Sequence, residues 1–317
     1  MTNLEKERLA ALSFNSFFKI GPRNITKLLE HFNSLDRAYQ ANFNDLRQAG
    51  IKDSLIYDFL NFRRNFSPEI ILNKLKQEDI KYLYFKEPSY PVLLKEIFDP
   101  PTIIYFKGSI DFNFEKCLAI VGSRKHGYYG QKAIERLITP LIEQGIVIVS
   151  GLASGIDSLA HQKTLDNKGK TIGVLGSSLE KKYIYPAKNR FLAENIIKSG
   201  GALISEFPLG TPPLRQNFPL RNRIISGLSQ AVLIIEAKER SGSLITANQA
   251  LEQGREVMAI PGSIFSEFST GTNILISNGA KLIKNSADIL ECFIEKKLIK
   301  YKELEQIKKR INQLDNN

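Results

Sequence analysis

The residues best suited to hold a charged ligand lie in the stretch RQNFPLRNRIISGLS, residues 215–229. It combines three arginines, Arg215, Arg221 and Arg223, with the aromatic residue Phe218, and it contains no acidic residue. Guanidinium groups clustered at a helix start favour phosphate binding, and an aromatic ring among them offers a platform for a stacked base. The alternative interpretation is a solvated basic helix without a ligand.

The same stretch predicts a helix that begins near Pro219. Pro219 suits the first turn of a helix, because a missing N–H costs nothing there. The apolar residues that follow recur at helical spacing and predict one packed face, formed by Leu220, Ile224, Ile225 and Leu228. Arg221, Asn222 and Arg223 are therefore expected beside the mouth of the site.

Composition permits a polyanionic partner without requiring one. The 317 residues include 44 Lys and Arg against 33 Asp and Glu, and the resulting net charge of +11 favours polyanions in general. The length and the 43% hydrophobic content fit a globular protein of two domains. No apolar run approaches the ~18 residues of a membrane span, and the N-terminus has no signal-peptide core. Cys117 and Cys292 form no disulfide framework, so we expect a cytoplasmic protein without membrane association.

The N-terminal part, residues 1–65, is predicted to be a small all-helical domain. The sequence Ile20-Gly21-Pro22 opens an apolar run at helical spacing, which resembles a helix-hairpin-helix unit. Backbone N–H groups at such a turn can approach a phosphate, although packing against a neighbouring element is the more common role. Residues 66–110 contain short extended runs among several prolines and are predicted to bridge two domains.

From Cys117 onward, apolar strand patterns alternate with helical patterns. Strands are expected at residues 117–121, 146–149, 171–175, 202–205, 231–235 and 257–260. Helices are expected at residues 130–143, 156–165, 187–198, 219–228 and 244–252. Continuous apolar runs are typical of parallel strands that are buried on both faces. The alternation predicts an α/β domain over residues 111–293, with a doubly wound, mostly parallel sheet.

Small residues stand directly after several of these strands, where such folds bind their ligands. Three turns have this character: Gly122-Ser123-Arg124, residues 150–157 with Gly151, and Ser241-Gly242-Ser243. Small residues let a backbone approach a ligand, and hydroxyls and N–H groups at helix starts accept oxyanions. Glycine also follows strands for steric reasons alone. Three such turns at one edge nevertheless predict a phosphate-binding edge, better suited to a strand of phosphates than to a single nucleotide.

Enzymatic alternatives match the sequence less well. The glycine turns after the first two strands do not have the G-x-G-x-x-G spacing of dinucleotide folds. Gly169-Lys170-Thr171 precedes a strand and lacks the upstream glycine of a P-loop. The histidines and cysteines show no metal-ligand spacing. Asp157 and His161 are four residues apart on one predicted helix and could form an acid-base pair, although such a pair more often pins its own helix.

In continuous order over residues 90–283, the chain resembles the DprA family of DNA-processing proteins, also called Smf. The resemblance rests on GSR from Gly122, SGLASGIDSLAH from Ser150, YP at Tyr185, SEFP from Ser205, NFPLRNRIISGLS from Asn217, SGSLITA from Ser241, AIPG from Ala259 and GTNILISNGA from Gly271. It implies an extended Rossmann-like domain behind a small sterile-alpha-motif-like helical domain. It also implies single-stranded DNA binding, dimer formation, loading of the RecA recombinase in natural transformation, and no defining catalytic activity.

The resemblance also assigns roles to residues. It implies that Gly122, Ser123 and Arg124 grip phosphate, that Arg215 contacts DNA and that Phe218 stacks on a base. It places a further DNA contact at Lys188, just past Tyr185-Pro186. Many members continue into a C-terminal winged-helix domain, whereas residues 294–317 here predict only a basic helix, so we expect that domain to be absent.

The sequence therefore predicts a single-stranded DNA-binding mediator that uses no cofactor and no metal and catalyses no reaction. The expected partners are single-stranded DNA, the RecA recombinase and a second copy of the chain. The alternative is a Rossmann-like enzyme that binds or hydrolyses nucleotide derivatives, with Glu236 or Asp157 at the strand ends as its acidic group.

Overall fold

The computed structural model describes residues 2–109, 111–112, 114–295, 306 and 308. The basic helix predicted over residues 294–317 therefore lies almost entirely outside the described residues. Among the described residues, no helix combines the length and the apolar character needed to cross a membrane.

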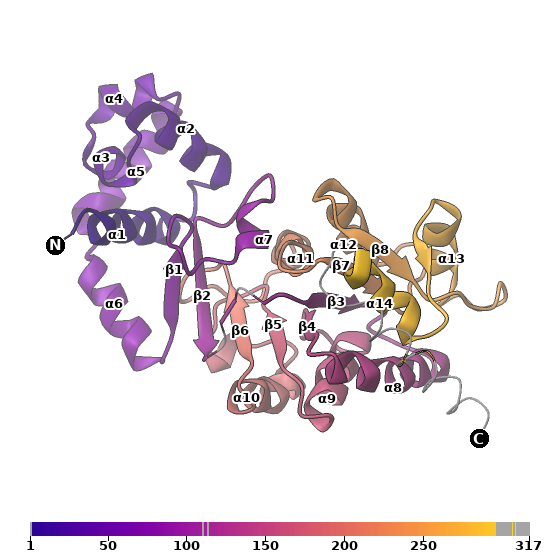
Figure 1. The fold of residues 1–317 in the computed structure, drawn as a ribbon. Coiled ribbons are helices and arrows are strands. Elements are labelled where there is room, and N and C mark those ends of the chain that lie inside the picture. The colour runs from indigo at the N-terminus through magenta and orange to yellow at the C-terminus, as the bar shows by residue number, and fades with distance from the viewer. Residues whose placement is uncertain (1, 110, 113, 296–305, 307, 309–317) are drawn as a thin grey trace.

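The chain begins with six helices, which gather at one end of the molecule (Figure 1). They are α1 (Asn3–Ser16), α2 (Pro22–Phe32), α3 (Leu35–Gln40), α4 (Phe43–Gln48), α5 (Asp53–Asn65) and α6 (Pro68–Gln77). Their core includes Phe14, whose ring stacks on that of Phe59 at 4.9 Å between centroids. Helix α2 begins after the Gly21 turn and buries Ile25 and Leu28, so this face of the hairpin packs inside the protein.

A nine-stranded sheet forms the centre of the molecule, in the order β1-β2-β6-β5-β4-β3-β7-β8-β9. The strands are β1 (Lys81–Tyr84), β2 (Ile103–Gly108), β3 (Cys117–Val121), β4 (Val147–Ser150), β5 (Thr171–Val174), β6 (Ala202–Ser205), β7 (Ala231–Ile234), β8 (Glu256–Ala259) and β9 (Lys281–Leu282). All neighbours from β6 to β9 pair in parallel. The predicted α/β class with a mostly parallel sheet is confirmed, and each of the six predicted strands is present.

The two extended runs that the sequence assigned to a bridge are strands of this sheet. Strand β1 pairs antiparallel with β2, which in turn pairs antiparallel with β6. The surrounding prolines lie outside both strands, so the N–H groups needed for pairing remain available. Two tyrosines of this edge also reach helix α1: the Tyr105 hydroxyl donates to Oδ1 of Asn15 at 2.7 Å, and the Tyr84 hydroxyl donates to Oε2 of Glu7 at 3.2 Å. The division at residues 65 and 110 stays a prediction.

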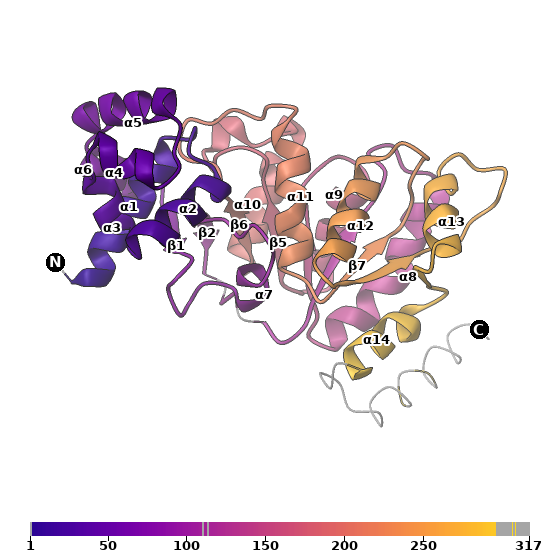
Figure 2. The ribbon, with the colours of Figure 1, turned by 90° about the horizontal axis from the view of Figure 1, so that it is seen from above.

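Helices cover both faces of the parallel part of the sheet (Figures 1 and 2). On one face lie α8 (Tyr128–Glu143), α9 (Ile156–Asp166) and α14 (Ser286–Glu295). On the other lie α7 (Val92–Lys95), α11 (Asn217–Gly227), α12 (Gly242–Glu252) and α13 (Thr270–Ser277). Helix α10 (Arg190–Lys198) follows two short 3₁₀ turns, η1 (Lys181–Tyr183) and η2 (Ala187–Asn189). Doubly wound folds bind ligands where the strand order reverses, which here is between β3 and β7.

Candidate nucleic-acid interface

A cavity of about 820 Å³ opens at the carboxyl ends of β3 and β7. This is the place where the strand order reverses, because β3 pairs with both β4 and β7. Most of the predicted site residues line it together: Gly122, Ser123, Arg124, Arg215, Phe218, Arg221, Asn222, Ser241, Gly242 and Ser243. The fold thus brings together segments that are more than a hundred residues apart in the sequence.

Two of the glycine-containing turns at this edge touch one another. A Cβ atom at Gly122 would lie 2.7 Å from Cγ1 of Ile156. A Cβ atom at Gly155, whose φ is +83°, would lie 2.3 Å from the carbonyl oxygen of Ser123. The Ile156 N–H donates to that oxygen at 3.1 Å. Contact between the turns therefore accounts for these glycines, independently of any ligand.

Arg221 lies at the bottom of the cavity and holds two strand ends together. Only 3% of the residue is exposed, and its guanidinium donates to the carbonyl oxygens of Gly151 and Val174. Burial lowers the pKa of Arg221 to about 10, because the charged form loses its water. Its charge is therefore largely directed into the protein.

Asp157 and His161 lie beside Arg221, and we call these three residues the buried polar layer. The Asp157 carboxylate accepts the N–H groups of Gly151 and Ala153 at 3.2 and 3.4 Å, and burial raises its pKa. Nδ1 of His161 lies 2.7 Å from Oγ1 of Thr171, and burial lowers the pKa of His161 to about 3. Asp157 and His161 thus bond to different partners, as expected of residues that pin their own helix.

Phe218 is half-buried in the cavity and is surrounded by cations and a second ring. The guanidinium carbons of Arg124 and Arg221 lie 5.5 and 5.9 Å from its ring centroid, within the range of cation–π attraction. The ring of Tyr185 lies at 5.9 Å between centroids. A Cβ atom at Gly176 would lie 3.0 Å from Cδ1 of Phe218, so glycine at this position leaves room for the ring.

Three exposed arginines surround the opening, and we call Arg124, Arg215 and Arg240 the rim. None of them forms an ion pair or hydrogen bond through its side chain with any residue that the structure describes. Asp157 supplies the acidic group of the lining. Helices α11 and α12 also begin here, and helix starts favour anions. The cavity opening is therefore positively charged and accessible.

Three predicted site residues lie outside the cavity lining. Gly151 is buried beneath it, where its carbonyl accepts from Arg221. Lys188 is exposed on η2. Arg223 is buried, and its Nε lies 3.1 Å from Oδ2 of Asp99 while its other end pairs with Glu206. Acidic residues from distant segments thus neutralise Arg223, although the local stretch contains no acidic residue.

The packed face of α11 also differs from the predicted one. Ile224, Ile225 and Leu228 are buried as expected, whereas Leu220 is 51% exposed. Arg221 takes its place, because residues three, four and seven positions apart share one face of a helix. The arginine could enter this apolar face because backbone carbonyl groups at the strand ends accept its protons.

The carboxylate of Glu236 is directed away from the cavity lining. It is buried and accepts the N–H groups of Gly127 and Gly130 at 2.8 and 3.1 Å, at the start of α8. An acidic group at a helix start is a stabilising cap. The structure therefore provides a structural role for the residue that the sequence offered as a candidate acid of a hydrolase.

Three charged or aromatic residues of the lining were not predicted as site residues from the sequence. Lys238 and Arg240 directly precede the Ser241 turn, so their position next to a predicted ligand-binding turn was an available signal. Lys238 pairs with Glu267 at 2.7 Å, whereas Arg240 belongs to the rim. Tyr185 was recognised only as part of a motif, and its approach to Phe218 depends on the fold.

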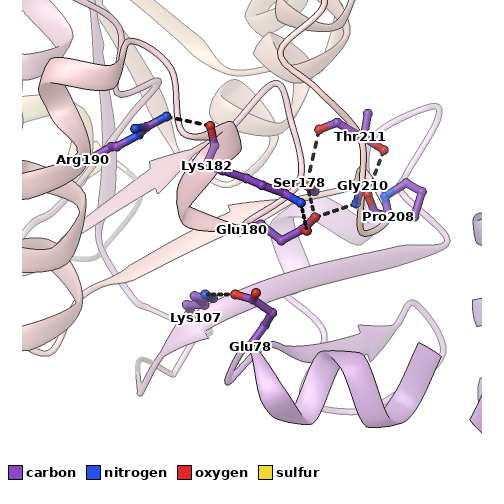
Figure 3. A network of polar contacts seen from close by, with 9 residues as sticks. All are labelled: Glu78, Lys107, Ser178, Glu180, Lys182, Arg190, Pro208, Gly210 and Thr211. Atoms are coloured by element: carbon purple, nitrogen blue, oxygen red, sulfur yellow. Dashed lines mark hydrogen bonds and ion pairs between the residues drawn. The ribbon is translucent and has the colours of Figure 1, made fainter. Parts of the chain in front are cut away.

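The loop that leads into α11 is anchored by a polar network (Figure 3). Oε2 of Glu180 accepts the Gly210 N–H at 2.6 Å and the Ser178 hydroxyl at 2.9 Å. The Ser178 N–H donates to the carbonyl oxygen of Thr211 at 3.0 Å. These bonds fix the segment just before Arg215 and thereby restrict where the exposed arginine can reach.

Comparison with known proteins connects this geometry to one family. The model of a family described as DNA recombination-mediator protein A matches residues 81–294. DNA processing protein DprA of Bacillus subtilis is 43% identical over 229 residues, which cover 71% of this chain and 76% of that protein. The solved structure of DprA from Streptococcus pneumoniae is similar, with a TM-score of 0.75, 36% identity, and coverage of 92% of this chain and 98% of that one.

A second solved structure adds a ligand to the comparison. It is DNA processing protein A from Helicobacter pylori, whose description refers to its single-stranded DNA binding mode. The similarity has a TM-score of 0.61 and 28% identity, and it covers 68% of this chain and 96% of that one.

Proposed function

Because the chain belongs to the DNA recombination-mediator protein A family, we propose that it binds single-stranded DNA in the cavity between the ends of β3 and β7. A relative of known structure is described by its single-stranded DNA binding mode. The observation that carries the proposal for this chain is the position of Phe218, half-buried in a cavity whose rim has three exposed arginines that form no ion pair with a described residue.

The two kinds of group in the cavity suit the two parts of a nucleotide. The rim arginines and the start of α12 attract phosphates, and Ser241 and Ser243 add hydroxyl groups there. The Phe218 ring offers a surface for a base. A base must leave its duplex stack to reach such a ring, so the site favours single strands over duplexes.

The roles of individual residues follow from their exposure. We assign phosphate contacts to Arg124, Arg215 and Arg240, and base stacking to Phe218. Gly122 and Ser123 form the turn that carries Arg124, while Asn222, Ser241, Gly242 and Ser243 complete the wall. Arg221 and Gly151 support the cavity from beneath, and Arg223 and Lys188 are not assigned to it.

The family membership further suggests a mediator that works in the cytoplasm as a dimer and loads the RecA recombinase onto incoming strands. One short cavity holds only a few nucleotides, so a second copy and a protein partner would extend its reach. Light scattering should give a dimer at micromolar concentration, and RecA should be retained by the immobilised protein. A monomer that retains no RecA would contradict this part of the proposal.

We propose that the protein binds DNA without altering it. The Asp157 and Glu236 carboxylates are both engaged by backbone N–H groups. A labelled oligonucleotide incubated with the protein and magnesium should therefore keep its length. Cleavage that is lost in an Asp157→Asn variant would establish a catalytic role instead.

The binding proposal is tested by fluorescence anisotropy with single-stranded and duplex oligonucleotides of equal length at one salt concentration. We expect the single strand to bind more tightly, because only unstacked bases can reach Phe218. Equal affinity for both forms would show that phosphate contacts alone determine binding, and it would exclude the stacking site.

A further inference from the structure

Tyr185 is the second aromatic residue of the cavity lining, and it is 51% exposed. Single exposed aromatic residues are common on protein surfaces and need no special explanation. Tyr185 differs because it faces another ring, that of Phe218, inside a cationic cavity. An accessible pair of aromatic rings beside arginines is the combination that binds successive bases in single-strand sites.

The backbone around Tyr185 is held from both sides. The Ser177 hydroxyl donates to the carbonyl oxygen of Tyr183 at 2.8 Å. The Asn189 side chain, which is buried, donates to the carbonyl oxygen of Leu152 at 2.8 Å, in the turn that follows β4. A ring on such an anchored segment loses little conformational freedom on binding, which favours affinity.

The distance between the two rings determines how bases could bind. Their centroids are 5.9 Å apart and their planes are inclined by 51°. A base enclosed between two parallel rings needs a separation of about 7 Å, since each contact takes about 3.5 Å. The observed pair is too close and too inclined for that arrangement. It does exceed the ~3.4 Å spacing of stacked bases along a strand, so it suits two neighbouring bases that have separated from one another.

We propose that Tyr185 is a second base platform and that the cavity holds two consecutive unpaired nucleotides, one on Phe218 and the next on Tyr185. This assignment rests on the proposed function and specifies its ligand as a single strand of at least two nucleotides. The phosphate between the two bases faces the cations of the lining. Recognition through ring faces makes the site tolerant of base sequence, because every base has such a face.

The test compares Tyr185→Ala, Tyr185→Phe and wild type by anisotropy with a twenty-residue thymidine oligonucleotide. Tyr185→Ala should weaken binding about 5- to 140-fold, the equivalent of the ~1–3 kcal/mol of one stacked base. Tyr185→Phe keeps the ring and should retain most of the wild-type affinity. The matched control is Phe191→Ala, which removes an aromatic residue that is 71% exposed on α10 and outside the lining.

Competition by thymidylates of increasing length then distinguishes a site that holds two bases from a site that holds one. Tyr185→Ala should weaken the dinucleotide and longer competitors and change the mononucleotide by less than about twofold. An equal loss with the mononucleotide would mean that one base touches both rings, which overturns the assignment. Wild-type affinity in Tyr185→Ala would overturn it as well, while leaving the proposed function intact. Failure of wild type to bind any single strand would instead reject the proposed function.

Discussion

The rim and the buried polar layer show how arginine serves two different purposes within one cavity. Arg221 is buried, donates to two backbone carbonyl groups and has a lowered pKa because of its burial. Arg124 and Arg215 are exposed and form no ion pair with any described residue. Arginine in the layer organises strand ends, whereas arginine in the rim is available to a ligand. Surroundings, rather than residue type, thus separate a structural cation from a binding one.

The largest expected effect is on stability, from Arg221→Met. The substitution removes the donor of two strand-end carbonyl groups and the cation beside the buried Asp157 carboxylate. We expect a loss of about 3 kcal/mol or more in the free energy of unfolding, measured by chemical denaturation. Arg215→Met is the matched control from the rim and should change stability by less than about 0.5 kcal/mol. Equal losses of unfolding free energy in both variants would show that arginines of the buried polar layer and of the rim contribute alike to stability.

The buried polar layer should also make stability depend on pH through His161. Burial lowers the pKa of folded His161 to about 3, whereas the unfolded residue titrates near about 6.5. Below about pH 6.5 the unfolded chain takes up a proton at His161 that the folded chain does not take up, so the free energy of unfolding falls as the pH decreases. The slope of this contribution approaches about 1.4 kcal/mol per pH unit.

The measurement compares wild type with His161→Asn, and with His126→Asn from the partly exposed turn beside Arg124. Between about pH 6 and pH 4.5, wild type and His126→Asn should lose stability more steeply than His161→Asn, which lacks that proton. Parallel pH profiles for all three proteins would show that His161 does not titrate differently in the folded state.

Phe218 lies between the buried polar layer and the rim. Its substitution should affect the affinity for single-stranded DNA. Phe218→Ala should weaken single-strand binding by about 1–3 kcal/mol, while the dependence of affinity on salt stays nearly unchanged. The melting temperature of the variant serves as the control, because the ring is half-buried beside Gly176. A lower melting temperature with unaltered affinity would make Phe218 a packing residue.

The sequence predicted those features that depend on short-range pattern. The apolar runs located every strand from β3 to β8, and the small residues after them located the edge with the cavity. Strands β1 and β2 were less evident, because β1 pairs with β2 and β2 joins the sheet only through β6, a strand far away in the sequence. The burial of Arg223 was not predictable either, since Asp99 and Glu206 reach it from other elements.

The central claim is that the rim holds phosphates, and the salt dependence of binding tests it most directly. Each phosphate contact contributes a slope of roughly −0.7 in log affinity against log salt for single strands. The variant with Arg124, Arg215 and Arg240 all changed to alanine should therefore bind with a slope that is shallower by about 2 and should melt at the wild-type temperature. An unchanged slope would contradict the account, because the phosphates would then be held elsewhere on the protein.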